Sequence, residues 1–285
     1  MPEEELDVVK GVLCMNGSVF KEGLFKGKKV FITGGATGMG LGFSRAFLEH
    51  GANVFIASRN AERLELASEK LKELTGKSVL WKVMDVREES SVEEAVEFIE
   101  QEWGSIDIVV NNAAGNFFCP IENLSENGWR AVVDIVLDGT FRVSKKCFPL
   151  LKQNGGSIVN IIANYAWNAA PYVGHSGAAK AGVLNLTRTL ALEWGRHNIR
   201  VNAMCPGVVL TEGVKENLLG DESMIERLEN DIPVGGIASV EQMAQQVLYL
   251  CSPAADVITG EVLVADGGQS LVGNMFYSLG REFYK

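Results

Sequence analysis

The stretch KKVFITGGATGMG, residues 28–40, decides the fold of this chain. Its first half is a short β-branched and aromatic run that is typical of a buried strand. Its second half spaces Gly34, Gly38 and Gly40 as G-x-x-x-G-x-G, with Thr37 and Met39 between them. Glycines at such a turn let the backbone approach a pyrophosphate, and the helix that follows directs its free N–H groups at that anion. The stretch therefore predicts the phosphate loop of a dinucleotide site.

Apolar runs of strand length recur along the whole chain, and longer amphipathic segments separate them. The expected strands cover residues 28–35, 53–58, 78–86, 106–113, 156–163, 199–207 and 261–268. The expected helices cover residues 39–50, 60–74, 90–103, 126–152, 176–196, 211–229 and 240–252. Apolar strands that alternate with helices indicate a parallel sheet covered on both faces. We therefore expect an α/β fold over residues 1–285, a single-domain, Rossmann-type, doubly wound parallel sheet of seven strands flanked by helices.

The composition excludes several classes of protein. A net charge of −10 and a pI near 5.0 argue against a nucleic-acid binder and against a polybasic membrane protein. No apolar run approaches the length of about 18 residues that a membrane-spanning helix needs. Five scattered cysteines without C-x-x-C spacing indicate reduced thiols rather than disulfides or a metal site. The acidic start MPEEELDVVKG and the end REFYK match no standard targeting signal, so we expect the cytosol.

The end of the second expected strand indicates which dinucleotide is bound. A site specific for NAD usually carries a carboxylate about 20 residues after the glycines, to hold the ribose 2′-hydroxyl. Ser58 and Arg59 stand at that position instead. A hydroxyl and a guanidinium suit a 2′-phosphate, so we predict NADP(H) as the cofactor. The alternative is a solvated arginine at the start of a helix.

Two further strand ends carry candidate cofactor ligands. Asp85, with Val86 after it, is placed to accept hydrogen bonds from the adenine amino group. The motif NNAAG, residues 111–115, supplies Asn112 and Ala113 at the edge where such sheets bind ligands. The alternatives are a helix cap for Asp85 and a plain strand-end turn for the asparagines.

These motifs, in this order, resemble the short-chain dehydrogenase/reductase family. The resemblance covers residues 25–270 and includes TGGATGMG, NNAAG, a helix that carries Lys180, and CPG followed by Thr211. It implies hydride transfer with a nicotinamide cofactor, and usually a homotetramer. It also implies that Lys180 holds the nicotinamide ribose and lowers the pKa of a nearby acid. The further cofactor contacts that it implies are Pro206, Gly207, Val209 and Thr211.

The chain departs from this family at the catalytic acid. The family's Tyr-x-x-x-Lys becomes Ser176-Gly-Ala-Ala-Lys180, and an alcohol is far less acidic than a phenol. One subgroup with this substitution is the 2,4-dienoyl-CoA reductases. Its mitochondrial branch has a tyrosine fifteen residues before the lysine, and that position is Tyr165 here. In the same subgroup, the asparagine that ends NNAAGN helps the tyrosine hold the thioester carbonyl; here it is Asn116. Ser176 is left as a secondary donor.

Other relatives leave alternatives open. The peroxisomal branch of the same reductases lacks that tyrosine and uses an aspartate in the long helix, which matches Asp134. The stretches HSGAAKAGVLNLTRTLALEW and SPAADVITG resemble peroxisomal trans-2-enoyl-CoA reductases. His175 is expected to line the start of its helix rather than to act as a base. The mitochondrial matrix and the peroxisome therefore stay open as locations beside the cytosol.

All these relatives act on acyl-CoA thioesters. We therefore expect NADPH-dependent reduction of 2,4-dienoyl-CoA to 3-enoyl-CoA, as in the β-oxidation of unsaturated fatty acids. The alternatives are a trans-2-enoyl-CoA reductase and a non-catalytic NADP(H)-binding regulator. We expect an N-terminal extension at 1–24 and a variable substrate-binding segment at 208–230, where Lys215 is one candidate for binding CoA.

Overall fold

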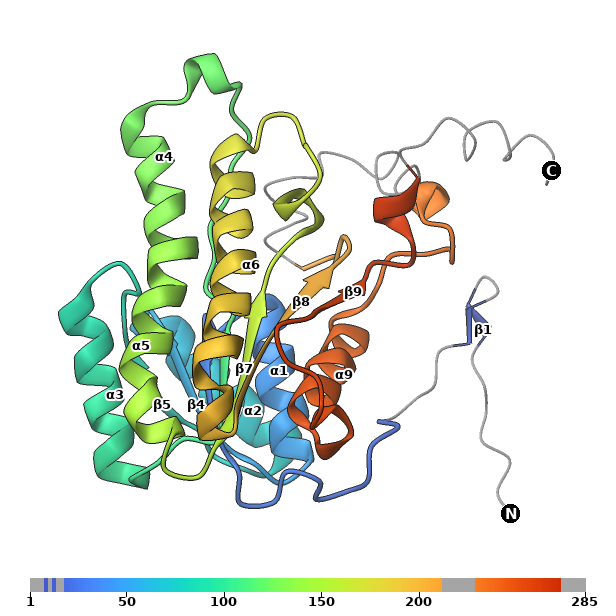
Figure 1. The fold of residues 1–285 in the computed structure, drawn as a ribbon. Coiled ribbons are helices and arrows are strands. Elements are labelled where there is room, and N and C mark those ends of the chain that lie inside the picture. The colour runs from blue at the N-terminus through green and yellow to red at the C-terminus, as the bar shows by residue number, and fades with distance from the viewer. Residues whose placement is uncertain (1–7, 10–11, 14–17, 212–228, 273–285) are drawn as a thin grey trace.

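The computed structural model describes residues 8–9, 12–13, 18–211 and 229–272. Its main sheet has seven parallel strands in the order β5-β4-β3-β6-β7-β8-β9 (Figure 1). In that order their bounds are Leu80–Val83, Asn53–Ser58, Lys29–Thr33, Ile108–Asn111, Gly156–Ile161, Ile199–Pro206 and Val262–Ala265. All seven predicted strands are present, and the predicted parallel, doubly wound sheet is confirmed.

The central strand β3 shows why its sequence is apolar throughout. Val30, Phe31 and Ile32 alternate between the two faces of the sheet, and all three are fully buried. Val30 and Ile32 belong to the core on one face, while Phe31 packs on the other with its ring 5.2 Å from that of Phe55. Burial of each such side chain contributes about 1.5–3 kcal/mol. A strand that has no solvent-facing side needs a continuous apolar run rather than an alternating one.

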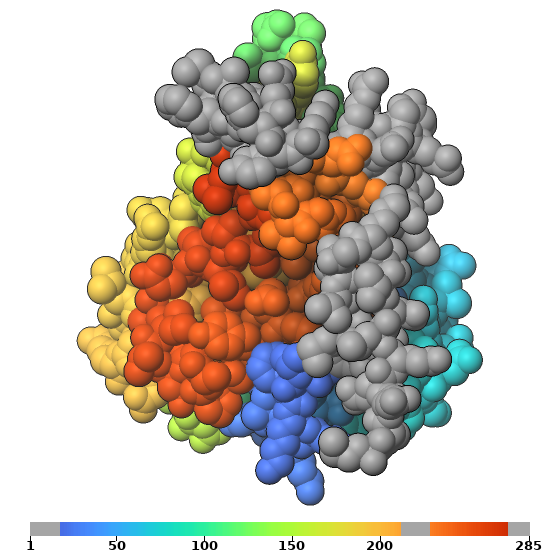
Figure 2. Space-filling view, turned by 90° about the vertical axis from the view of Figure 1, so that its right-hand side faces the viewer, coloured from blue at the N-terminus to red at the C-terminus, as the bar shows by residue number. Residues whose placement is uncertain are grey.

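Helices cover both faces of this sheet (Figure 1). On one face lie α1 (Gly38–Glu49), α2 (Ala61–Thr75) and α9 (Val240–Cys251). On the other face lie α3 (Glu89–Trp103), α5 (Gly139–Leu151) and α6 (Gly174–Trp194). Figure 2 views the molecule from the side of α9, where the C-terminal part of the chain, in orange and red, spreads above the N-terminal segment in blue. The two segments meet where Ser18 Oγ donates a hydrogen bond to Gln245 of α9 at 2.9 Å.

The single helix predicted over 126–152 is wrong in one respect, because a wider turn interrupts it. Helix α4 (Glu126–Val133) is followed by a π-helical segment, Asp134–Asp138, and then by α5. At its end the N–H of Gly139 bonds to the carbonyl of Asp134, five residues back. Gly139 also lies against Val86, which a Cβ would meet at 2.8 Å. This close approach between distant segments cannot be predicted from the residues around Gly139 in the sequence. Such π segments occur frequently at functional sites.

The ends of the chain are described only in part. Two short strands that the sequence did not predict, β1 (Val8–Val9) and β2 (Val12–Leu13), pair antiparallel within the expected extension. The helix expected at 211–229 lies outside the described residues except at its two ends, and Lys215 lies outside them altogether. In the described part of the chain, no helix is long and apolar enough to cross a membrane. Four cysteines there are free thiols, as predicted: Cys119, Cys147, Cys205 and Cys251.

Candidate active site

The predicted site residues follow neighbouring strands of the sheet at their carboxyl ends. Gly34 follows β3, Asn112 follows β6, and Gly207 follows β8. Strands β4 and β5 extend the sheet on one side of β3, and β6 to β9 extend it on the other. The chain therefore reverses its direction of winding between β3 and β6. Sheets of this type bind their ligands outside the carboxyl ends of the strands at such a point.

The glycine loop has the shape that a pyrophosphate requires. Gly34 and Gly38 have positive φ angles of 64° and 51°, which residues with a Cβ rarely adopt. A Cβ at Gly40 would lie 2.2 Å from the carbonyl oxygen of Gly34, so only glycine fits. Thr37 precedes α1 in an extended conformation and is exposed, with no hydrogen bond from its side chain to the helix, and Met39 is half-buried against the core. The free N–H groups at the start of α1 therefore adjoin a tightly wound glycine loop, and this arrangement fits a dinucleotide.

Asn112 braces this loop. Its amide Nδ2 donates to the carbonyl oxygens of Thr33 at 3.0 Å and of Gly34 at 3.2 Å. The backbone N–H groups of Asn112 and Ala113 both donate to Thr33 Oγ1, each at 3.0 Å. The donor groups of the Asn112 amide are thus directed at the backbone of the glycine loop. Thr33, as the anchor for both N–H groups, is a residue that the sequence reasoning missed.

The segment after β8 approaches the same loop from the other side. A Cβ at Gly38 would meet Thr211 Cγ2 at 3.3 Å, so these two predicted cofactor residues lie together. A Cβ at Gly207 would meet the Cα of Asp266 at 2.9 Å, which makes glycine necessary there as well. Pro206 ends β8, and Val209 is buried and bridged to Ala238.

The expected adenine end of the site holds an unforeseen ion pair. The carboxylate of Asp85 accepts hydrogen bonds from the guanidinium of Arg87, with the shortest at 2.6 Å, and from its backbone N–H at 3.0 Å. These hydrogen bonds hold the pKa of Asp85 below its ordinary value, although partial burial opposes the effect. Glu88, not Asp85, occupies the N-cap position of α3, although its side chain makes no capping hydrogen bond, so the alternative of a helix cap for Asp85 is wrong. Adenine would have to share Asp85 with Arg87, which the sequence reasoning missed because the pair is formed within a turn.

Arg59 lies at this same end. It is exposed just after β4, next to the half-buried Ser58, and within electrostatic reach of Asp85. Ser58 Oγ makes only a long contact of 3.5 Å, with the carbonyl of Asn60. Val86 is buried, and its carbonyl accepts a hydrogen bond from Arg142 at 3.3 Å.

Three of the predicted catalytic residues lie together at the end of β7. Tyr165 is in the short 3-10 helix Asn164–Ala166, and its hydroxyl accepts a long hydrogen bond of 3.3 Å from Ser176 Oγ. Lys180, one turn further along α6, is only 6% exposed and donates to the carbonyl of Ile161 at the end of β7. Cys205, at the end of the neighbouring strand β8, lies within electrostatic reach of both Tyr165 and Lys180.

Burial shifts the pKa values of these three side chains. It raises the pKa of Tyr165 above its ordinary value, an effect that the hydrogen bond from Ser176 partly offsets. It lowers the pKa of Lys180 from 10.5 to about 8. It also raises the pKa of Cys205 to about 12, so this neighbour stays an uncharged thiol at neutral pH. Near pH 7 the site therefore combines a neutral phenol with an ammonium group.

Asn116 and Asp134 are not joined to this group by any hydrogen bond between described residues. Asn116 is exposed, and its Oδ1 accepts the backbone N–H of Phe117 at 2.9 Å. Asp134 starts the π segment and lies 3.9 Å from Arg130, with a third of its side chain exposed. Its carboxylate is also within electrostatic reach of Arg87. Both side chains remain open to other partners.

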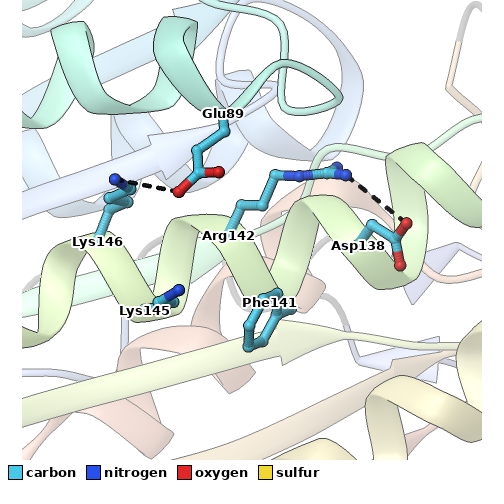
Figure 3. A pocket seen from close by; sticks show the side chains of 6 residues that line it. All are labelled: Glu89, Asp138, Phe141, Arg142, Lys145 and Lys146. Carbon is cyan, nitrogen blue, oxygen red and sulfur yellow. Dashed lines mark ion pairs between the residues drawn. The ribbon is translucent and has the colours of Figure 1, made fainter.

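A cavity of about 350 Å³ lies elsewhere, beside α5 (Figure 3). It contains none of the predicted site residues. Four of its charged side chains pair with each other: Lys146 lies 3.2 Å from Glu89, and Arg142 lies 3.7 Å from Asp138. Its lining consists of Glu89, Asp138, Phe141, Arg142, Lys145 and Lys146. Within the described ranges, no cluster of His, Cys, Asp or Glu is arranged to hold a metal ion.

Fold and site together define a nicotinamide-dependent oxidoreductase, and comparison with known proteins names the family. The family model described as "Enoyl-(Acyl carrier protein) reductase" matches residues 34–270. The chain belongs to the short-chain dehydrogenase/reductase family. The resemblance drawn from the sequence motifs is thereby confirmed.

Individual relatives carry more specific names. A probable 2,4-dienoyl-CoA reductase of Bacillus subtilis, named as (2E)-enoyl-CoA-producing, is 41% identical over 86% of this chain and 97% of its own. The peroxisomal 2,4-dienoyl-CoA reductase of Pongo abelii, named as (3E)-enoyl-CoA-producing, is 41% identical over 88% of this chain and 86% of its own.

Two solved structures have the same fold. A short chain dehydrogenase from Bacillus anthracis is 43% identical and superposes with a TM-score of 0.78, covering 87% of this chain and 98% of that one. A gluconate 5-dehydrogenase from Burkholderia cenocepacia in complex with NADP and tartrate is 30% identical, with a TM-score of 0.81 over 86% of this chain and 96% of that one.

Proposed function

We propose that this protein reduces 2,4-dienoyl-CoA thioesters to 3-enoyl-CoA with NADPH. The observation that carries the proposal is the hydrogen bond between Ser176 and Tyr165. It places a phenol beside the serine that replaces the family's usual acid. The names of the Bacillus subtilis and Pongo abelii relatives support the same substrate class.

NADPH, when bound, supplies a hydride to C5 of the dienoyl chain. Negative charge then develops on the thioester oxygen, several bonds away, and protonation at C2 leaves the double bond between C3 and C4. The donor must therefore face the thioester oxygen rather than the carbon that is reduced. A tyrosine displaced from position 176 to position 165 fits this requirement better than one beside the hydride acceptor.

Four side chains of the protein take part in the proposed reaction. Tyr165 is a neutral phenol at pH 7, and burial raises its pKa further, so it can donate a hydrogen bond or a proton to the developing oxyanion. Ser176 donates to the Tyr165 oxygen and would stabilise the negative charge left there. Lys180, charged below about pH 8, would hold the nicotinamide ribose. Asn116, whose Oδ1 already accepts a backbone N–H, would donate to the thioester oxygen through Nδ2.

Asp134 is the rival acid. It starts the π segment and is only partly buried, and none of the described catalytic side chains hydrogen-bonds to it. The atom nearest to its carboxylate among the described cations belongs to Arg130, at 3.9 Å, whereas Tyr165 is hydrogen-bonded to Ser176. We therefore assign the proton donor to Tyr165.

A trans-2-enoyl-CoA reductase is the second candidate, and the description of the matching family as an enoyl reductase favours it. The two reactions differ in the carbon that takes the hydride, C5 or C3. A non-catalytic NADP(H)-binding regulator is the third candidate and would show no turnover at all.

NADP(H) is the cofactor in this proposal. The glycine loop fits a dinucleotide, and Arg59 is exposed where the 2′-phosphate would lie. The gluconate 5-dehydrogenase of the same fold was solved with NADP. We further propose a homotetramer, and the cytosol as location with the peroxisome named for several relatives as the alternative.

One isotope experiment separates these candidates. Purified protein is incubated with 4-deuterated NADPH and, in turn, 2,4-hexadienoyl-CoA, crotonyl-CoA and acetoacetyl-CoA, and NADPH oxidation and the position of the label are measured. We expect turnover of the dienoyl thioester with deuterium at C5. A repeat in D₂O with unlabelled NADPH should place solvent deuterium at C2, whereas label at C4 would indicate a 2-enoyl product. Turnover of crotonyl-CoA alone, or of no thioester, would contradict the proposal.

A further inference from the structure

His175 is the most poorly satisfied buried side chain in the described part of the molecule. It lies in the first turn of α6, and its side chain is fully buried. Neither Nδ1 nor Nε2 has a hydrogen-bond partner among the described residues. Buried polar groups in folded proteins are nearly always paired, and an unpaired one indicates a partner that comes from outside the chain, such as water or a ligand.

The surroundings of His175 explain its burial but not its polarity. Its ring packs edge to face against Phe117, with the centroids 4.5 Å apart. The carbonyl of Val173 lies close enough to favour the protonated ring slightly, but it already accepts the N–H of Gly177 at 2.8 Å. Burial lowers the pKa of His175, so the ring is neutral at pH 7 and offers one donor and one acceptor.

The position of His175 connects the two segments that carry the proposed donors. Phe117, which touches its ring, directly follows Asn116, and the backbone N–H of Phe117 is bonded to the Asn116 side chain. On the other side, Ser176 is the next residue in the chain and bonds to Tyr165. A ligand whose polar end reaches Asn116 and Tyr165 therefore passes close to His175.

The chemistry of the ring selects the part of the ligand that it meets. An acyl chain has no acceptor and would leave the imidazole N–H unpaired. The thioester carbonyl is the polar group nearest the reacting carbons, and its oxygen accepts hydrogen bonds more strongly as negative charge develops. A neutral imidazole that donates to this oxygen would act most strongly in the transition state.

We propose that His175 is a positioning residue for the thioester: one of its ring nitrogens hydrogen-bonds to the carbonyl oxygen, directly or through one water, and holds it facing Tyr165. This inference rests on the proposed function and adds a residue to it. It also explains why a polar ring occupies a buried position at which neither of its nitrogens has a partner among the described residues.

The test compares His175→Phe with His175→Gln in the full-length protein. The phenylalanine variant keeps the ring and its packing but removes both nitrogens, whereas glutamine keeps a donor and an acceptor. For His175→Phe we expect kcat on 2,4-hexadienoyl-CoA to fall by about tenfold to a hundredfold. The NADPH dissociation constant should equal that of the wild type. The melting temperature without ligand should not fall below the wild-type value. His175→Gln should recover most of the lost kcat.

His50 provides a matched control. It is also buried, and its ring lies edge to face on Phe20, but its Nδ1 is hydrogen-bonded to the carbonyl of Ala46 at 2.7 Å. His50→Phe should lower the melting temperature and leave kcat unchanged, which is the opposite pattern.

Three outcomes decide the matter. Wild-type kcat in His175→Phe would overturn the inference and leave the proposed function intact. A variant that loses stability, with glutamine no better than phenylalanine, would show a purely structural role and would overturn it as well. Absence of turnover by the wild type on the dienoyl thioester would instead contradict the proposed function itself.

Discussion

Ser176 Oγ lies 3.3 Å from Tyr165 Oη, so the serine at the family's usual acid position donates a hydrogen bond to the tyrosine that precedes it by eleven residues. The two residues come from different elements, since Tyr165 follows β7 and Ser176 lies in the first turn of α6. Lys180 follows on the same helix. Tyr165 thus lies beside the family's usual acid position in space, although it precedes that position along the chain.

Replacing Tyr165 by phenylalanine removes only the hydroxyl of the proposed acid. Loss of one donor to a developing oxyanion lowers turnover by about 10²–10³. We expect Tyr165→Phe to reach that range in kcat on 2,4-hexadienoyl-CoA with an unchanged NADPH dissociation constant. Asp134→Asn is the control, and it should retain most activity. The reverse result, with an active phenylalanine variant and an inactive asparagine variant, would assign the acid to Asp134.

The buried ammonium of Lys180 should leave a signature in stability against pH. Its pKa of about 8 in the folded protein lies below the ordinary 10.5, so between these values the unfolded chain binds a proton that the folded protein does not. The contribution of Lys180 to the free energy of unfolding therefore rises as the pH rises from about 8 to 10.5. Lys180→Met should be more stable than wild type near pH 7, and this advantage should shrink towards pH 10.

The same titration should affect cofactor binding. Because Lys180 loses its charge above about pH 8, the NADPH dissociation constant of the wild type should rise above that pH. Isothermal titration calorimetry between pH 6.5 and 9.5 measures the NADPH dissociation constant of the wild type and of Lys180→Met. A methionine variant that binds NADPH as wild type does at every pH would remove Lys180 from the cofactor site.

Arg59 should decide between NADPH and NADH. Removing one charged hydrogen bond costs about 1.5–3 kcal/mol, which corresponds to a dissociation constant raised by tenfold or more. Arg59→Ala should therefore weaken the binding of NADPH to this extent and leave the binding of NADH nearly unchanged. Arg63, exposed in the first turn of α2, is the matched control, and Arg63→Ala should alter the affinity for neither cofactor. If Arg59→Ala weakened the binding of NADPH and NADH equally, the assignment of Arg59 to the 2′-phosphate would be wrong.

Tyr172 carries backbone strain that a single substitution should release. Its φ is 66°, a left-handed conformation that costs a residue with a Cβ roughly 1–2 kcal/mol. The residue is 56% exposed, and its carbonyl accepts the N–H of Cys119 at 2.8 Å, a bond that glycine would keep. Tyr172→Gly should therefore raise the free energy of unfolding in urea by up to about 1 kcal/mol, after the greater chain entropy of glycine is subtracted.

The control for this prediction is the other described non-glycine residue with positive φ. Asn198 has a φ of 57°, and asparagine tolerates this conformation better than tyrosine does. Asn198→Gly should gain less stability. A loss of stability in Tyr172→Gly would mean that the ring's packing outweighs the strain.

The sequence by itself predicted the seven strands of the main sheet, the glycine loop and the tyrosine candidate. Strands and helices follow from apolar periodicity, which depends on neighbours along the chain, and the central strand β3 is apolar because both of its faces are covered. The loop after it needs glycine for reasons of backbone geometry alone, as the close approach of Gly40 to Gly34 shows. The fifteen-residue offset between Tyr165 and Lys180 could likewise be counted from the sequence.

Only the tertiary structure decided which side chains are partners. Asp85 is held by Arg87, and the Asn112 amide is directed at the glycine loop, although both were expected to serve the cofactor directly. The interruption of the long helix at Asp134 and the unpaired ring of His175 were equally hidden. Each depends on contacts between segments that are distant in sequence or on the exact course of a turn. Periodicity records which face of an element is buried, but it carries no information on which residue of another element lies opposite.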